Sequence, residues 1–249
     1  MIDVYGGIFL DIYVNGEKPH EKNIDIFPGG SGFNIALGLS ILNNDVRFIG
    51  NIGNDLFKTK INEEFEKNNI NIDYLKINDG KSDVFISENE KPFAVQRKNN
   101  DLEIDIPKKL SEYAFVNSEI NPKSLNRILE LDYRIIFIDT GPRHFLLNEY
   151  YKKKNHFLIS NSNNNNITHE KCDLLKMDLK GFCYKNKFYS SNGKELTYKF
   201  GTGDLLDVLV IDSLIKNNLS HEKLMSFTKI IENTNKIKGA FNKILLLTK

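Results

Sequence analysis

The chain has 249 residues, enough for one α/β domain with a sizeable buried core and a small appendage. Its 34 basic and 33 acidic residues give a formal net charge of +1, so the composition offers no electrostatic reason to expect nucleic acid or an anionic membrane as partner. The chain has two cysteines and no secretory leader pattern, and no apolar run approaches the ~20 residues that cross a bilayer. These features favour a reduced, cytoplasmic location.

The first hundred residues predict several strands and one apolar helix. We expect residues 1–14 to form one strand that passes through Gly6 and Gly7. After the stretch Pro28–Gly32, apolar residues recur at helical spacing from Ile35 to Leu42, with Ser31 as the expected N-cap. The remaining elements expected here are a polar helix at 58–69 and strands at 23–27, 46–52, 83–87 and 93–97, the last two as a hairpin.

The second half alternates between strand and helix patterns. The strands are expected at 113–116, 134–139, 157–160, 174–177 and 182–189, and the helices at 121–131, 204–216 and 221–237. This alternation favours a parallel sheet. The predicted fold class is therefore α/β, a doubly wound and mostly parallel sheet in a single domain over 1–249, with a small β-sheet lid inserted from segments about 11–27 and 82–98.

The turn Gly201-Thr202-Gly203-Asp204 stands directly before an apolar helix. Its two glycines permit a tight turn and leave backbone amides free at the helix N-terminus, where the helix dipole favours phosphate oxygens. A carboxylate at this corner can accept the proton of a hydroxyl that attacks a phosphoryl group. The alternative is an ordinary glycine turn in which Asp204 serves as a helix N-cap.

A second glycine-rich stretch runs from Pro28 to Ala36. It is not a dinucleotide fingerprint, because Ile35 stands where the third glycine would be. Its glycines would still let a polar ligand approach the backbone, with the amide of Asn34 facing the same cleft. The alternative is a strand-to-helix turn in which Asn34 satisfies local backbone groups.

The order of these motifs resembles that of the ribokinase-like family, which includes fructokinases, adenosine kinases and the B-type phosphofructokinases. The shared pattern is Gly7-x-x-x-Asp11, then Gly29-Gly30-x-x-x-Asn34, then Gly50-x-x-Gly53-x-Asp55, then Gly201-x-Gly203-Asp204. The resemblance covers nearly the whole chain. It is closest at 28–55 and 201–209 and weak between 144 and 198.

The resemblance implies a kinase that transfers the γ-phosphoryl group of ATP, with Mg²⁺, to a primary hydroxyl of a sugar or nucleoside. By likeness, Asp204 is the catalytic base, and the backbone amides of Gly201, Thr202 and Gly203 form the anion hole. The acceptor would be held by Asp11, Gly29, Gly30, Asn34 and Glu119, and the nucleotide would lie near Arg143, Lys180 and Gly181. For Glu119 the alternative is a solvated loop carboxylate, and for Arg143 a surface arginine. Family members often share the lid in a dimer, so a homodimer through the lid is expected.

The chain also departs from the family pattern. Asn164 stands where the family's Asn-x-x-Glu motif has the glutamate that organises water around Mg²⁺, and Glu170 is the candidate substitute. Asp178 replaces the first glycine of a Gly-x-x-Gly turn near the nucleotide. Residues 198–200 replace an Asp-Thr pair that helps to bind a monovalent cation, so we expect no potassium activation.

Three functions therefore compete. The first is an active sugar or nucleoside kinase. The second is a degenerate family member that binds a sugar or nucleotide without efficient catalysis, which Asn164 and Asp178 favour. The third is an unrelated Rossmann-type nucleotide binder. The five histidines lack metal-ligand spacing, so no protein-held zinc is expected. Ser31, where some relatives carry lysine, argues against ribose as the acceptor.

Overall fold

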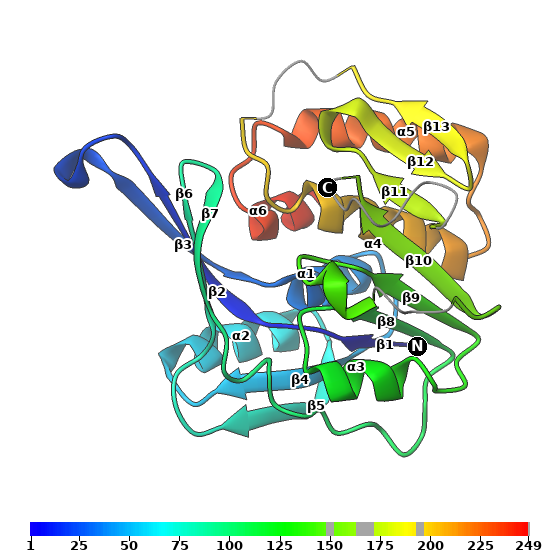
Figure 1. The fold of residues 1–249 in the computed structure, drawn as a ribbon, viewed down its shortest axis with the longest axis horizontal. Coiled ribbons are helices and arrows are strands. Elements are labelled where there is room, and N and C mark those ends of the chain that lie inside the picture. Colours follow the sequence, from blue (N-terminus) through cyan, green and yellow to red (C-terminus); the bar gives the residue numbers. More distant parts are fainter. Residues whose placement is uncertain (148–151, 163–171, 193–196, 249) are drawn as a thin grey trace.

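The computed structural model describes residues 1–147, 152–162, 172–192 and 197–248, which form two sheets (Figure 1). The larger sheet has the strand order β13-β12-β11-β10-β9-β8-β1-β4-β5. The seven strands from β11 to β5 are parallel, and β12 and β13 are antiparallel additions at one edge. Their bounds are β1 (Ile2–Tyr5), β4 (Val46–Gly53), β5 (Asn71–Asn78), β8 (Tyr113–Asn117), β9 (Ile135–Asp139), β10 (His156–Asn161), β11 (Leu174–Lys176), β12 (Gly181–Tyr184) and β13 (Lys187–Ser190).

Helices cover both faces of this sheet. They are α1 (Ser31–Ile41), α2 (Leu56–Lys67), α3 (Pro122–Ile128), α4 (Thr202–Ile215), α5 (His221–Thr234) and α6 (Ala240–Leu245). One core cluster joins α1, α2, α4 and α5 to one face, and a second joins α3 to the other. In α4 every side chain from Leu205 to Ser213 is buried, as expected of a helix packed on several sides. The predicted α/β class is confirmed.

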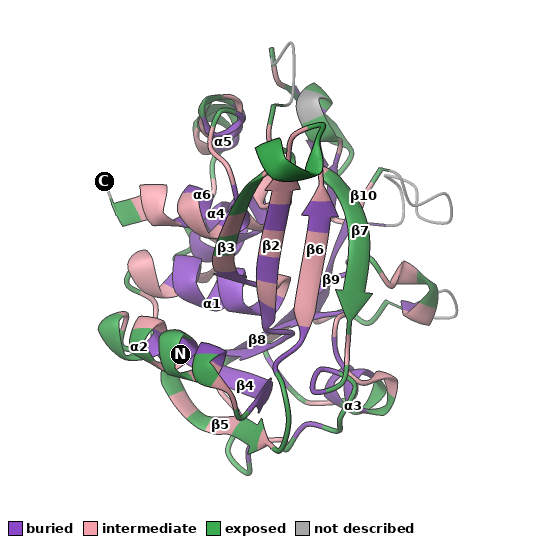
Figure 2. Ribbon diagram, turned by 90° about the vertical axis from the view of Figure 1, so that its left-hand side faces the viewer, coloured by how far each residue is buried: buried purple, intermediate pink, exposed green. Residues whose placement is uncertain are grey.

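The smaller sheet has the order β3-β2-β6-β7 and projects from the larger one (Figure 1). Its strands are β2 (Phe9–Asn15), β3 (Asn23–Gly29), β6 (Val84–Glu88) and β7 (Lys91–Gln96), of which β2 and β6 run parallel. The register puts Asp11 and Phe27 on one face and Ile12 and Ile26 on the other. The face of Asp11 is turned toward the helices, because Tyr13 contacts the ring of Phe200. Figure 2 shows β7 exposed along its length.

Two predicted strands are wrong in extent. Residues 1–14 break at Gly6–Ile8 into β1 and β2, which belong to different sheets. The break lies where the backbone of Gly6 crosses that of Gly32, so closely that a Cβ on either would approach the other residue's Cα to 2.4 Å. Residues 182–189 form a hairpin instead of one strand, because Lys185 and Asn186 turn the chain with positive φ of 44° and 65°.

Two elements were not predicted. Strand β5 escaped prediction because its side chains are mostly polar and exposed or half-buried, and α6 because it spans six residues. The expected N-cap is also wrong: Gly30, with φ of 92°, occupies the cap position, and Ser31 is the first helical residue. Short 3₁₀ turns complete the described chain at Pro19–Glu21, His144–Leu147, Asp178–Lys180 and Leu246–Thr248. None of the described helices is both long enough and apolar enough to span a membrane.

Candidate active site

Polar residues end four neighbouring parallel strands of the larger sheet. Asn117 ends β8 and pairs in register with Asp139, which ends β9, and Asn161 of β10 pairs with Lys176 of β11. The strand order reverses beside β8, because the chain moves outward from β1 to β4 and β5 and then returns to the other side of β1. Ligands of open α/β sheets bind at the carboxyl ends of strands at such a reversal. The polar strand ends therefore mark the candidate site.

Asp204 is held between the first turns of two helices. It lies in the first turn of α4, where Ser31 Oγ donates to its Oδ1 at 2.9 Å and Asn34 Nδ2 to its Oδ2 at 2.7 Å. Ser31 and Asn34 both belong to the first turn of α1. Because the N-terminal ends of two helices meet here, their dipoles favour negative charge at this place. The alternative of Asp204 as an N-cap is wrong, since Gly201 occupies the cap.

The turn before α4 is shaped by Gly201 and held by Lys243. Gly201 has a left-handed backbone with φ of 85°, and a Cβ there would come within 2.2 Å of Ala240 Cα. The buried Lys243 donates from Nζ to the carbonyl of Tyr198 and to Thr202 Oγ1, each at 2.7 Å. Burial lowers the pKa of Lys243 to about 8. The first amides of a helix have no intrahelical acceptor, so this fixed turn offers them to an anion.

Asp11 and Glu119 bring two further carboxyl groups to the same place. Glu119 Oε2 accepts from the backbone N–H of Ser31 at 3.1 Å and from Asn117 Nδ2 at 3.2 Å. Burial, followed by the charge of Asp204, raises the pKa of Glu119 to about 7. Glu119 is thus half-buried and hydrogen-bonded to α1 and β8, which a freely solvated loop carboxylate would not be.

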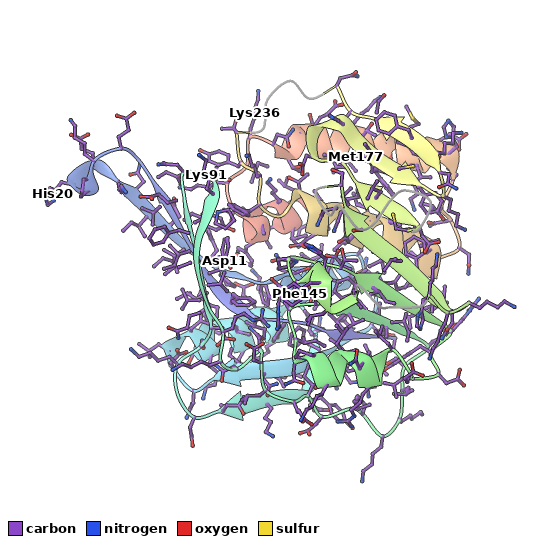
Figure 3. The ribbon with its side chains drawn as sticks, in the orientation of Figure 1. Asp11, His20, Lys91, Phe145, Met177 and Lys236 are labelled. Atoms are coloured by element: carbon purple, nitrogen blue, oxygen red, sulfur yellow. The ribbon has the colours of Figure 1, made fainter. Side chains whose placement is uncertain are left out.

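Asp11 comes from the smaller sheet, where that sheet meets the helices (Figure 3). The hydroxyl of Tyr13 donates to Asp11 Oδ2 at 3.1 Å. Burial raises the pKa of Asp11 well above its usual value, and the charges of Glu119 and Asp204 add to the shift. Gly29 is required beside it, because a Cβ would stand 2.1 Å from Asp11 Oδ2. There is no room for a side chain at Gly30 either, because a Cβ there would lie 2.5 Å from Gly7 O.

Lys176 ends β11 beneath α4 and is buried among acids. Its ammonium lies 2.7 Å from Asp207 Oδ2 and 3.3 Å from Asp139 Oδ1, and the attraction of these two carboxylates outweighs burial and raises its pKa. Burial also raises the pKa of Asp204, while the charge of Lys176 and the hydrogen bond from Asn34 act in the opposite direction. Lys176 thus helps to keep Asp204 ionised.

The carboxylates of Asp139, Asp204 and Asp207 offer oxygens that all lie within 4.8 Å of one another. Three carboxylate oxygens form a donor set that hard divalent cations prefer. The ammonium of Lys176 already binds two of these acids, so the cluster does not fit a divalent ion held by the protein.

The residues predicted near the nucleotide have other partners. Arg143 donates to Asp101 Oδ1 at 3.1 Å and to the carbonyl of Ile120 at 3.2 Å. Lys180 and Gly181 lie on the turn from β11 to β12, with Lys180 exposed. Gly181 has φ of 108° and approaches the backbone of Tyr189. Asn164 and Glu170 lie outside the described residues.

Several site residues were not singled out from the sequence. They are the Ser31 hydroxyl, which was assigned to a cap, and the side chains of Tyr13, Lys176, Asp207 and Lys243. A signal existed for two of them. Lys176 interrupts the apolar run of β11, and Asp207 interrupts that of α4. A charge in a fully buried element requires an opposite charge or hydrogen bonds nearby, so these two residues were candidates for pairing with each other.

Comparisons of sequence relate the chain to kinases. Residues 1–115 match the model of the pfkB family carbohydrate kinases. A guanosine-inosine kinase of Exiguobacterium acetylicum is 32% identical over 82 residues, which cover 30% of this chain and 27% of the relative. A 5-dehydro-2-deoxygluconokinase of Mesomycoplasma hyopneumoniae is 38% identical over 103 residues, covering 39% and 30%. The chain spans less than a third of the length of these curated relatives in the matched regions.

Comparisons of structure cover nearly the full length. A ribokinase of Thermotoga maritima superposes with a TM-score of 0.76 at 18% identity, covering 99% of this chain and 98% of the other. A ribokinase of Cryptococcus neoformans in complex with ADP gives 0.78 at 15% identity, covering 98% and 96%. At these identities the likeness shows the fold. The first 115 residues therefore match the pfkB family carbohydrate kinases, and the chain has the ribokinase fold over nearly its whole length.

Proposed function

We propose that the chain transfers the γ-phosphoryl group of ATP to a hydroxyl of a sugar or nucleoside, with Asp204 as the base. The observation that carries the proposal is the position of Asp204. It lies in the first turn of α4, oriented by Ser31 and Asn34, behind the glycine turn at 201–203. A base and a set of free amides at one corner are what an in-line attack on a phosphoryl group requires.

In the proposed reaction the acceptor hydroxyl attacks the γ-phosphorus. The new O–P bond forms as the bond to the bridging oxygen of ADP breaks, and the hydroxyl proton passes to Asp204. The amides of 201–203 stabilise the charge that develops on the transferred group. Asp11, Asn34 and Glu119 lie beside Asp204 and offer carboxyl and amide groups to the other hydroxyls of the acceptor.

Support for the substrates comes from the relatives. The solved neighbours include a ribokinase of Arabidopsis thaliana complexed with ribose and ATP and an aminoimidazole riboside kinase of Salmonella enterica complexed with its riboside and an ATP analog. The curated relatives are named for a nucleoside and for a sugar acid. The acceptor class therefore stays as broad as sugars and nucleosides. Magnesium belongs to the proposal as the ion that accompanies ATP and neutralises its phosphates.

Acceptor-dependent consumption of ATP tests the proposal. The wild type and Asp204→Asn are compared across a panel of sugars and nucleosides with Mg²⁺. We expect turnover with at least one acceptor and a loss of about 10³-fold in the variant, the scale of general-base catalysis.

Asp212→Asn is the matched control, because Asp212 lies on the same helix but pairs with Lys216 away from the site. It should keep wild-type turnover. Retained turnover in Asp204→Asn would contradict the role of this residue. If no acceptor in the panel supports ATP consumption, but ATP or a sugar still raises the melting temperature, the degenerate binder is favoured.

A further inference from the structure

The lysine at the end of β11 is unusually placed for a charged side chain. Lys176 follows Leu174 and Leu175 in a strand whose three residues are all buried, and it is 7% exposed. A buried ammonium is costly unless charges of opposite sign and hydrogen bonds compensate for its lost hydration. Its partners should therefore explain why the strand ends in lysine.

The acidic side chains around the Lys176 ammonium lie close to one another. Asp207 lies in α4 and is fully buried, and Asp139 ends β9 and is 3% exposed. Together with Asp204 they bring three carboxylates within 4.8 Å of one another. The ammonium of Lys176 lies 2.7 Å from Asp207 and 3.3 Å from Asp139, so it offsets part of the charge of a cluster whose oxygens would also suit a divalent ion.

The same ammonium lies against the turn that carries Asp204. A Cβ placed on Gly203 would be 3.6 Å from Lys176 Nζ. Gly203 is the residue directly before Asp204 and supplies one of the amides of the proposed anion hole. A positive charge beside this turn acts on the same oxygens that its amides would bind.

We propose that Lys176 is the fixed cation of this site: it occupies the position of a divalent ion among Asp139, Asp204 and Asp207, and its charge supports transfer of the phosphoryl group beside Gly203. The first part stands on the geometry alone. The second part rests on the proposed kinase function. A salt bridge with a purely structural role would give the fold stability and nothing else.

Binding of Mn²⁺ to the protein without nucleotide tests the first part and requires no turnover. Electron paramagnetic resonance should detect no Mn²⁺ bound to the cluster in the wild type, whereas Lys176→Met should bind about one ion per chain. The melting temperature of Lys176→Met should rise with added Mn²⁺, because an ion that binds only the folded state stabilises that state. The melting temperature of the wild type should not change. Lys216→Met is the matched control, since it removes another lysine bonded to an aspartate of α4.

Two results would overturn this part. One is a bound Mn²⁺ in the wild type that Asp207→Asn removes. The other is a Lys176→Met protein whose melting temperature responds to Mn²⁺ no more than that of the wild type.

The double variant Lys176→Met/Asp207→Asn tests the second part. It removes one charge of each sign, so the net charge of the cluster stays unchanged and no ammonium or Asp207 carboxylate is left without its partner. If Lys176 acts on the reaction, this variant keeps a melting temperature near that of the wild type but loses about 100-fold in kcat, the scale of removing one charge-stabilising donor. Wild-type kcat in the double variant would assign Lys176 a structural role and overturn this part. If the wild type turns over no acceptor, the proposed function fails and the Mn²⁺ measurements still decide the first part.

Discussion

Glu119 and Asp204 titrate as neighbours, and this sets a pH dependence at the scale of single residues. Burial and the charge of Asp204 raise the pKa of Glu119 from 4.5 to about 7. Between these values the folded state binds a proton that the unfolded state has released. The stability that this proton contributes is complete below pH 4.5 and is lost as the pH rises through 7.

Glu119→Gln should therefore stabilise the chain at pH 8 and have little effect at pH 5. We expect a gain of roughly 1 kcal/mol at pH 8, allowing for solvent screening of a half-buried group, which is about 2–4 °C in melting temperature. Thermal unfolding at the two pH values measures it, with Glu63→Gln on the exposed face of α2 as control. An equal difference at pH 5 and pH 8 would contradict the assignment.

At the scale of the element, the two glycines of the turn before α4 have different structural roles. Gly201 is left-handed and its Cβ position overlaps the backbone of Ala240, whereas a Cβ on Gly203 meets nothing closer than 3.5 Å. Gly201 is needed for the backbone to turn, and Gly203 leaves space beside Lys176. Substituting alanine at each position in turn should therefore distinguish the role of Gly201 in the fold from the role of Gly203 at the site.

Gly201→Ala should destabilise the fold by about 2–4 kcal/mol, from backbone strain and overpacking against α6. Gly203→Ala should keep the melting temperature or raise it slightly, because alanine favours the helix, while its methyl group reduces turnover at the anion hole. Denaturant unfolding and steady-state kinetics on both variants check this pair. If Gly203→Ala unfolds as readily as Gly201→Ala, the two glycines have the same structural task.

At the scale of the whole molecule, the smaller sheet has an apolar face whose isoleucines are exposed among the described residues. Ile24 and Ile26 are 63% and 54% exposed on the face opposite Asp11, next to Ile12 and Val14 of β2. A contiguous exposed apolar face on a sheet marks an interaction surface. The occupant we propose is the same face of a second copy, as the resemblance to lid-sharing dimers implies.

Light scattering on the purified chain should then give the mass of a dimer. Ile24→Lys/Ile26→Lys should give a monomer, because two charges on each copy would oppose pairing. Ile77→Lys is the control, since Ile77 is 50% exposed on β5, in the other sheet. A monomeric wild type, or a double variant that stays dimeric, would contradict the lid interface.

The sequence by itself determined the fold class and the two segments that carry Asp204 and Asn34. Apolar periodicity and glycine-rich turns are local properties, so they identify α1 and α4 and the turn at 201–204 without any knowledge of packing. The order of these motifs along the chain indicated the family. The break between β1 and β2 at Gly6–Ile8 could not be predicted from local sequence, because it depends on the close crossing of Gly6 with Gly32.

Only the tertiary structure decided what the charged residues do. Ser31 and Asp204 are 173 positions apart, and Lys176 and Asp207 are 31 apart, so no spacing rule connects them. They meet because parallel strands present their carboxyl ends at one edge and because α1 and α4 bring their first turns together there. The pKa of each group follows from burial and from neighbours that belong to other elements, which is why the sequence named the acids and the fold assigned their partners.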